Sequence, residues 1–284
     1  MLQYNSSTSG YAKRSSDIGN ADSTGINLSQ VQVGSHTAST ISGFDMGYIA
    51  NLSGKEKLNQ SWSVTTATGG ASAVPYRWEG VGKWANTSAS INEIDFKTSA
   101  TQTWTAGSEV VVLGWDPADT HTTNFWEELA SVELGTTANN IDSGTISAKK
   151  YLWVQCFIES SGGATNASVQ FNGDTANNYS NRLSINGGAD STDTSSGNIG
   201  CFSTGSADEN GFINFFAINN SANEKLCVGS NVSVSTTGAG SAPDRREGVG
   251  KWANTSAQIT SINISEATAG TYGAKTFLKV WGSD

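Results

Sequence analysis

The residues Glu79-Gly-Val-Gly-Lys-Trp-Ala-Asn-Thr-Ser-Ala89 recur letter for letter as residues Glu247 to Ala257, 168 positions later. A repeat of this length at one fixed spacing is the sequence signature of a chain built from more than one example of the same structural unit. The chain has 284 residues. That length allows two domains of ordinary size, each with its own apolar core.

The same spacing links positions well beyond the repeated stretch. Without any gap, it joins Tyr11, Arg14, Gly19, residues 21–24, Gly43, Phe44, residues 56–58, Pro75 and Gly114 to identical residues 168 positions later. We therefore predict an internal duplication, with a first domain over residues 1–124 and a second over residues 125–284. Matches spread this widely predict the same fold in both copies.

The second copy begins with a stretch that the first copy does not have. Residues 125–168 have no counterpart 168 positions earlier, and they include the apolar run from Tyr151 to Ile158, one of the strongest strand signals in the chain. The first copy is therefore expected to lack its opening strand or strands. Either another chain supplies that strand at an exposed sheet edge, or residues 1–40 cover the edge, or the sheet is smaller.

Composition favours β-structure with many turns. Apolar residues make up 36% of the chain and charged residues only 14%, and Gly, Ser, Thr, Asn and Ala supply most of the rest. The nine Trp, ten Phe and seven Tyr argue against disorder, because large aromatic side chains need a core or a contact surface. We predict an all-β chain of two tandem antiparallel β-sandwich domains of the jelly-roll type.

Two segments with period-two alternation predict matching strands in the two copies. They are residues 109–115 and residues 277–281, and the second begins 168 positions after the first. Alternation directs every second side chain to the same face of a sheet. The face expected to be buried carries Val110 and Val112 in the first segment and Leu278 and Val280 in the second.

Two further features depart from simple alternation. In residues 90–96 and 258–264 the apolar residues stand two apart only after a first spacing of three, which predicts a bulge or bend in both copies. Residues 123–134 carry the one helical pattern, with Thr123 or Asn124 placed to cap a short turn. That helix is expected to open the second domain.

Paired charges precede the repeated tryptophan in both copies. Arg77 and Glu79, and likewise Arg245 and Glu247, stand two residues apart and therefore share one face of an extended segment. This arrangement is either a ligand-binding constellation or a structural ion pair. The glycines that follow lack the spacing of a phosphate-binding loop, and no apolar helix comes after them, which excludes a nucleotide site of that kind.

The rest of the motif has a structural explanation. Trp84 and Trp252 have the pattern of core aromatics, and Asn86 and Asn254 begin turns that their own side chains can close. Packing and turn chemistry explain the identity of the two copies as well as a ligand would. We therefore predict a structural role for these residues and for the paired charges, with both tryptophans mostly buried and both asparagines bonded to local backbone.

The sequence predicts no catalytic centre. His36 and His121 are the only histidines, and neither lies in a metal-binding or nucleophile motif. No acidic residue stands out as half of a glycosidase pair. The expected protein is not an enzyme and uses no cofactor.

Clusters of side-chain oxygens raise the question of calcium. The polar stretch 172–178, or Asp190 together with Asp193, offers oxygen ligands, but neither fits an EF-hand loop. A polar turn is the preferred interpretation of both segments. We therefore predict no metal ligand.

The three cysteines are widely spaced. Cys156, Cys201 and Cys227 contain no Cys-x-x-Cys pair of the kind used for zinc or redox chemistry. We interpret them as small buried side chains. An oxidising compartment would permit a Cys201–Cys227 disulfide.

The charge balance limits the class of partner. The formal net charge is -9 and the pI is about 4.7, and there is no basic patch to release counterions from nucleic acid or an anionic membrane. Nucleic acid and membrane are therefore not expected partners. We also expect no signal peptide and no transmembrane segment, because no apolar run approaches the roughly 20 residues of a membrane span.

Four segments of the second copy together form a pattern that can be compared with known protein families. They are Trp126 with Leu129, residues 143–152, residues 171–179 and residues 250–256. This pattern resembles β-sandwich structural modules of tailed-bacteriophage virion proteins. In the first copy the resemblance fits from Tyr11 onward, and Gln3-Tyr-Asn5 is a degraded echo of Gln170-Phe-Asn172. The resemblance implies a capsid decoration, head-fibre or tail-associated protein that is assembled into virions in the host cytoplasm.

The resemblance also bears on partners. It implies contacts with other virion subunits and a homo-oligomer, for which a trimer is the expected form. The main alternative is a carbohydrate-binding β-sandwich of the adhesin or lectin type, with a host surface glycan as partner. Jelly rolls bind glycans through exposed Trp and Tyr, and the chain has both in quantity. Exposed indoles along a groove would favour that alternative.

Overall fold

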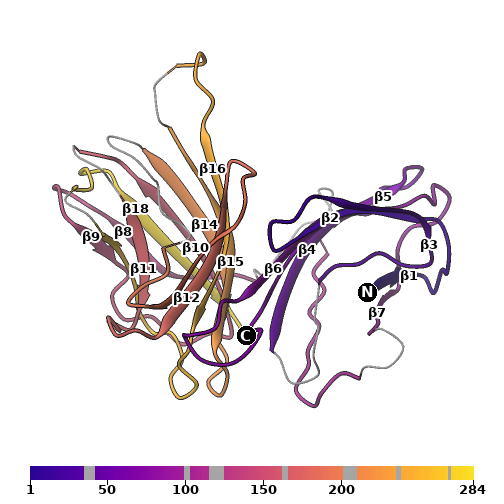
Figure 1. Ribbon diagram of the computed structural model, residues 1–284, viewed down its shortest axis with the longest axis horizontal. Helices are drawn as coiled ribbons and strands as arrows, with labels where there is room; N and C mark the ends of the chain where they lie inside the picture. Colours follow the sequence, from indigo (N-terminus) through magenta and orange to yellow (C-terminus); the bar gives the residue numbers. More distant parts are fainter. Residues whose placement is uncertain are drawn as a thin grey trace.

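The computed structural model describes residues 1–34, 42–98, 103–114, 125–161, 166–200, 210–234, 238–267 and 270–284. Every regular element in these ranges is a β-strand, and every strand pair is antiparallel (Figure 1). Over these ranges, no helix is long and apolar enough to cross a membrane. The predicted all-β antiparallel class is confirmed, and the sheets are consistent with β-sandwich domains.

The largest sheet lies in the C-terminal half, which we define as residues 125–284. Its eight strands follow the spatial order β13 (Ser191–Ser196), β12 (Tyr179–Ile185), β16 (Asp244–Trp252), β15 (Lys225–Ser233), β14 (Gly211–Ile218), β10 (Tyr151–Ile158), β18 (Phe277–Ser283) and β8 (Glu127–Glu133). Period-two alternation explains the burial of β10, in which Leu152, Val154, Cys156 and Ile158 all point into the core.

A three-stranded sheet covers the inner face of this larger sheet. It has the order β11 (Ala167–Phe171), β17 (Ile262–Glu266) and β9 (Asn140–Asp142). The core between the two sheets includes Ile141, Val154, Phe171, Tyr179, Phe215, Trp252, Ile264 and Val280. Each such side chain stabilises the fold by about 1.5–3 kcal/mol relative to exposure.

The N-terminal half, residues 1–124, has a smaller sheet and a smaller core. Five strands follow the order β3 (Ser23–Leu28), β2 (Tyr11–Asp17), β6 (Tyr76–Trp84), β5 (Lys57–Thr65) and β4 (Gly43–Ala50). A two-stranded sheet of β1 (Leu2–Tyr4) and β7 (Ile94–Phe96) accompanies it. The buried apolar cluster consists of Leu2, Tyr4, Tyr11, Val31, Val33 and Trp84.

Strand bounds in the two halves follow the spacing of the sequence repeat. The five strands β2 to β6 begin and end 168 residues before β12 to β16. The pairing register agrees as well, because Tyr11 stands opposite Trp84 just as Tyr179 stands opposite Trp252. We call two residues 168 positions apart counterparts.

The halves differ beyond β4 and β14. In the larger sheet β14 is followed by β10, β18 and β8, whereas in the described N-terminal residues β4 pairs only with β5 and ends its sheet. Residues 109–114, the counterparts of residues in β18, form no strand, and Val110 and Val112 are exposed. The strand predicted there is wrong over its described residues. β18 is held between β10 and β8, and the described N-terminal residues provide neither partner.

The other predictions from alternation have mixed outcomes. In the C-terminal half the expected buried face of β18 is confirmed, because Leu278 and Val280 are fully buried. The helix predicted over residues 123–134 is wrong, since Glu127–Glu133 is β8 and pairs with β18, while Thr123 and Asn124 lie outside the described residues. Pairing with a neighbouring strand outweighs a weak local helical pattern.

The predicted bulges also take a different form. β7 begins at Ile94 and β17 at Ile262, so each strand starts only after the irregular spacing of three. The pairing of β7 with β1 and of β17 with β11 runs without a shift in register. The irregular spacing therefore marks the approach to each strand and not a bulge within it.

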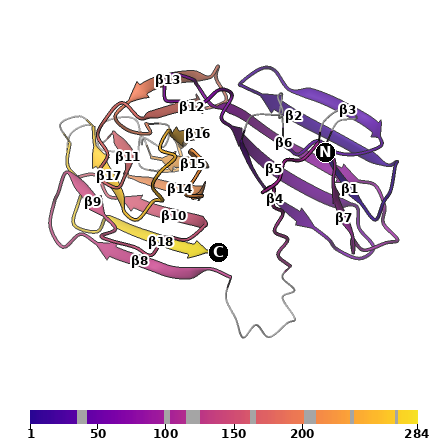
Figure 2. The ribbon, with the colours of Figure 1, turned by 90° about the horizontal axis from the view of Figure 1, so that it is seen from below.

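The two halves contact each other through the outer faces of their larger sheets. β4 and β5 contact β15, and β6 contacts β16. The apolar side chains between them include Phe44, Met46, Trp62 and Val64 from the N-terminal half and Phe216, Leu226, Val228 and Val249 from the C-terminal half. Figures 1 and 2 show these sheets meeting, with the smaller sheets on the far sides of the pair.

Candidate functional site

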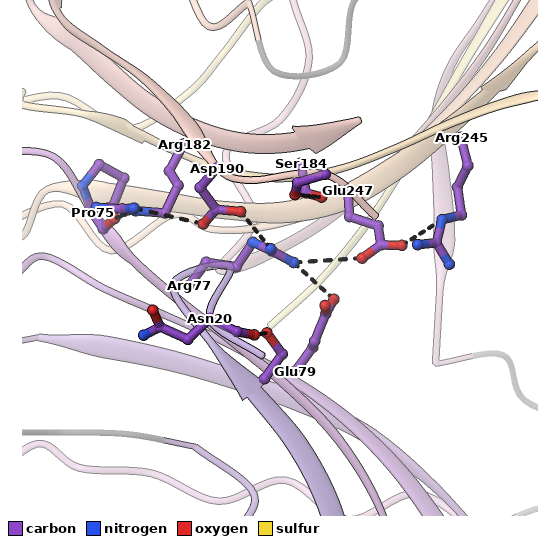
Figure 3. Close-up of polar contacts among 11 residues, drawn as sticks. Asn20, Pro75, Arg77, Glu79, Arg182, Ser184, Asp190, Arg245 and Glu247 are labelled. Atoms are coloured by element: carbon purple, nitrogen blue, oxygen red, sulfur yellow. Dashed lines mark hydrogen bonds and ion pairs between the residues drawn. The ribbon is translucent and has the colours of Figure 1, made fainter. Parts of the chain in front are cut away.

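A network of charges crosses the interface between the halves, and Arg77 on β6 lies at its centre (Figure 3). The Arg77 side chain is almost fully buried. Its guanidinium lies 2.7 Å from Asp190, 2.9 Å from Glu79 and 3.4 Å from Glu247. Glu79 belongs to the same half as Arg77, and the other two carboxylates belong to the opposite half. One buried cation therefore links acidic groups of both halves.

Two further arginines extend the network within the C-terminal half. Arg182 Nη1 lies 3.6 Å from Asp190, and Arg182 Nε donates a hydrogen bond of 3.0 Å to the carbonyl of Pro75. Arg245 Nε lies 2.7 Å from Glu247. The network thus joins the segment before β6 to both β12 and β16.

Glu79 is the acidic group whose protonation responds most to this setting. Burial, followed by the neighbouring Glu247 carboxyl, raises the pKa of Glu79 to about 7, although Arg77 acts in the opposite direction. When two carboxyl groups lie this close, ionisation of the second is disfavoured. Glu79 therefore gains or loses its proton near neutral pH, at the contact between the halves.

An open cavity of about 310 Å³ borders the network. Its lining includes Asn20, Asp22, Ser184 and Gly187 as well as the paired arginines and glutamates. Small-molecule sites are lined mainly by apolar and aromatic side chains, and this lining is polar. Among the described residues, no cluster of side chains is arranged to hold a metal ion. The charge network and its polar cavity are therefore better suited to holding the two halves together than to binding a small molecule.

The loop between β5 and β6 makes a second polar contact across the interface. Lys251, fully buried on β16, donates hydrogen bonds to the carbonyls of Thr66 at 3.3 Å and Thr68 at 2.9 Å, and its Nζ lies 3.5 Å from Glu224. Glu224 accepts a hydrogen bond of 2.5 Å from the backbone N–H of Gly70. Burial lowers the pKa of Lys251, and Glu224 acts to raise it. The loop thus provides two of the hydrogen bonds of this buried charge.

The sequence identified part of this site. It predicted that each Arg-x-Glu pair shares one face, and each pair does form its own ion pair. It did not predict that the two pairs meet in one network, nor that Asp190 and Arg182 join them. A signal was present, because Asp190 and Arg182 have identical counterparts at Asp22 and Arg14.

The repeated tryptophans lie in the core of each half. Trp84 and Trp252 are both buried, and each stacks on the tyrosine opposite, with ring centroids 6.2 Å apart for Tyr11 and 6.3 Å apart for Tyr179. Both interplanar angles are 16°. The burial predicted from the motif is therefore present in both halves.

The asparagine that follows each tryptophan closes a turn as expected. Asn86 Oδ1 accepts hydrogen bonds from the backbone N–H groups of Ser88 and Ala89, at 2.9 and 2.8 Å. Asn254 Oδ1 accepts the corresponding bonds from residues 256 and 257 at the same two distances. The repeated Ala-Asn-Thr-Ser stretch is thus explained by local backbone chemistry.

A buried lysine beside each tryptophan escaped the sequence analysis. Lys57 Nζ donates hydrogen bonds to the carbonyls of Lys55 and Asn86, and Lys225 Nζ donates to those of Asn223 and Asn254. Burial lowers the pKa of Lys225 to about 8. The repeated Glu-Lys-Leu stretch was the available signal.

The remaining candidates have ordinary structural environments. Asp174 accepts hydrogen bonds from Ala176 N–H and Asn178 Nδ2, both at 2.9 Å, and from the Trp252 indole at 2.7 Å, as in a polar turn. Cys156 and Cys227 are buried free thiols, and burial raises the pKa of both. Cys201, His36 and His121 lie outside the described residues.

No protein-family model matches the chain, and neither does any curated protein or solved structure.

Proposed function

We propose that this chain is a non-enzymatic virion structural protein of a tailed phage, in a capsid decoration, head-fibre or tail-associated position, and that it acts through protein–protein contacts. In this proposal the halves are two copies of one antiparallel β-sandwich module of the jelly-roll type. The observation that carries it is the edge of β4, which pairs only with β5 in the described residues. Such an edge presents backbone groups that can accept a further strand.

The C-terminal half indicates what kind of strand would fit beside β4. There β10 pairs with β14 along its whole length and on its other side with β18. In the N-terminal half the residues 110–113, counterparts of β18 residues, are exposed apolar side chains. A partner strand with alternating apolar residues, like β10, would pair with β4 and bury part of this apolar segment. β-strand addition of this kind is a recurrent mode of peptide recognition.

A peptide with the sequence of residues 151–158 tests the strand-acceptor role. We expect it to slow hydrogen exchange in residues 43–50 of the full chain, because it mimics the strand that pairs with β14. A peptide of the same composition without the alternation is the matched control. Slow exchange of residues 43–50 in the free chain, equal to that of residues 211–218, would contradict the proposal, as would the absence of any effect of the peptide.

The virion role has a separate test. Immunogold labelling of intact phage particles with antibodies against the chain should mark the particle surface at a defined position. Labelling of the infected host without labelling of particles would overturn the virion assignment and leave the strand-acceptor role to be judged by hydrogen exchange.

One observation favours the carbohydrate-binding alternative. On the outer face of the larger sheet, next to the interface cluster that contains Phe216, the half-buried Trp153 stacks on Trp281 with ring centroids 4.8 Å apart. Stacked aromatics can provide a platform for sugar rings. A glycan array with the wild type and with Trp281→Ala tests this, with the exposed Trp104→Ala as control. Selective loss of signal in Trp281→Ala would favour glycan binding.

A further inference from the structure

The apolar contact between the halves uses a different part of the sheet in each. The N-terminal half contributes Phe44, Met46, Trp62 and Val64, whose counterparts are Phe212, Asn214, Ser230 and Val232. The C-terminal half contributes Phe216, Leu226, Val228 and Val249, whose counterparts are Tyr48, Leu58, Gln60 and Val81. These two sets share no position. The apolar contact is therefore heterologous, although the counterparts Glu79 and Glu247 both join the charge network, and each half keeps the apolar positions that the other half has used.

The unused surface of the N-terminal half is apolar and exposed. Tyr48, Leu58 and Val81 are 60%, 55% and 50% exposed. Their counterparts Phe216, Leu226 and Val249 are 9%, 1% and 0% exposed. The difference arises because the N-terminal half covers the second set. A cluster of exposed apolar side chains on one face of a sheet is typical of a protein–protein contact.

The charges of that unused surface are arranged as in the covered one. Glu56 and Lys83 form an exposed ion pair at 2.9 Å, where their counterparts Glu224 and Lys251 hold the β5–β6 loop. Arg14 and Asp22 form another ion pair at 3.4 Å, but Asp22 lines the cavity between the halves and is therefore not part of the unused surface. We call Tyr48, Glu56, Leu58, Val81 and Lys83 the acceptor surface.

The C-terminal half keeps the complementary surface. Val232 is 42% exposed, whereas its counterpart Val64 is fully buried between the halves. The Arg245 side chain is 60% exposed, whereas that of Arg77 is 5% exposed. Gly238 has φ 98°, close to the 88° of Gly70, the residue that contacts Glu224. We call Val232, Val234 and Gly238 the donor surface; the Arg245 side chain is exposed but lines the cavity between the halves.

We infer that a second copy of this chain docks its donor surface on the acceptor surface, so that chains associate head to tail. The apolar part of the intramolecular contact is the template: Val232 of one chain packs on Leu58 of the next in the way that Val64 packs in the interface between the halves. Every chain has one donor and one acceptor surface. Repetition of this contact therefore produces either a closed ring or a filament.

The contact between chains is weaker than the one within the chain. Met46 and Trp62 are replaced by the polar counterparts Asn214 and Ser230 on the donor side, and Val228 by Gln60 on the acceptor side. Less apolar surface is buried, and no covalent link raises the effective concentration. Association should therefore be reversible and depend on protein concentration. This inference does not depend on the virion role.

Sedimentation velocity of the full chain over a range of concentrations is the first test. We expect the wild type to associate, and Leu58→Asp and Val232→Asp each to weaken association by roughly tenfold or more, because each places an unpaired charge in the contact. Ile26→Asp is the matched control, since Ile26 is exposed and lies on neither surface. A monomeric wild type at every concentration, or equal effects of all three variants, would overturn the inference.

Mixing the two defective chains separates head-to-tail association from a symmetric contact. Leu58→Asp retains an intact donor surface and Val232→Asp an intact acceptor surface, so the mixture should form one-to-one dimers and nothing larger. Circular dichroism establishes that both variants are folded. A mixture that stays monomeric while the wild type associates would show that the two surfaces do not bind each other.

Discussion

Arg77 and Arg245 are counterparts in the same repeated motif, yet one is buried against three carboxylates and the other is largely solvated. The same contrast separates Lys251, which is buried under a loop of the other half, from Lys83, which pairs with Glu56 in solvent. The same residue in the repeated sequence thus contributes differently to the free energy of unfolding in the two halves. The difference comes from what covers each surface, so substitutions at counterpart positions measure the interface directly.

The largest effect is expected from replacing the buried tryptophan that both halves share. Trp252→Ala should destabilise the C-terminal half by about 3–5 kcal/mol, since it empties a fully buried indole site next to Tyr179 and Phe171. Trp84→Ala should have a similar effect on the N-terminal half. Urea unfolding followed by hydrogen exchange in each half checks this. Equal loss of protection in both halves from either variant would contradict separate cores.

Removal of Arg77 tests the interface itself. Arg77→Ala leaves buried carboxylates without their cation and should destabilise the contact by about 3 kcal/mol or more. Arg245→Ala is the matched control. It should lower the free energy of unfolding by less than about 1 kcal/mol, because the Arg245 side chain that pairs with Glu247 is largely exposed to solvent. Urea midpoints of both variants provide the measurement. Equal midpoints would mean that burial of Arg77 contributes nothing.

The turn asparagines should show no difference between the halves. Asn86→Ala and Asn254→Ala each remove hydrogen bonds to two backbone N–H groups, and each should cost about 1 kcal/mol. Because both turns are local, the two values should agree within error. Thermal unfolding of the two variants checks this, and a clearly larger cost for one of them would reveal a contact beyond the turn.

Glu79 offers the smallest and most specific perturbation. Its pKa is raised from 4.5 to about 7, so between these two pH values the folded state keeps a proton that the unfolded state releases. This contribution to stability is fully present below pH 4.5 and is lost as pH rises through about 7. Glu79→Gln should flatten the fall in urea midpoint between those pH values. Parallel pH profiles for wild type and variant would exclude Glu79 as the titrating group.

Period-two alternation and aromatic content were enough to predict an all-β antiparallel chain, and the repeat predicted that Trp84 and Trp252 share the same environment. Alternation failed at residues 109–114 because a strand needs neighbouring strands to pair with. The repeat shows that the first copy has no counterparts of β10 and β8, which flank β18, but alternation within one segment carries no information about its neighbours. The helical pattern over residues 123–134 failed for the opposite reason, because β18 provides a neighbouring strand that the local pattern does not reveal.

The candidate site was predicted in its parts and not in its assembly. Residues two apart on a strand share a face whatever the tertiary structure, so each Arg-x-Glu pair could be recognised from spacing alone. The meeting of Arg77 with Asp190 and Glu247 depends on how two sheets pack across more than 100 residues of chain. No local rule determines that packing.

The pairing of β18 with both β10 and β8 sets an order of events during synthesis. The five-stranded sheet needs only residues up to Trp84 and can form as soon as they leave the ribosome. The eight-stranded sheet joins residues near 130 to residues near 280, so loop closure delays its completion until β18 has emerged. Phe44 and Val64 of the N-terminal half therefore stay exposed to solvent until the eight-stranded sheet forms and buries them.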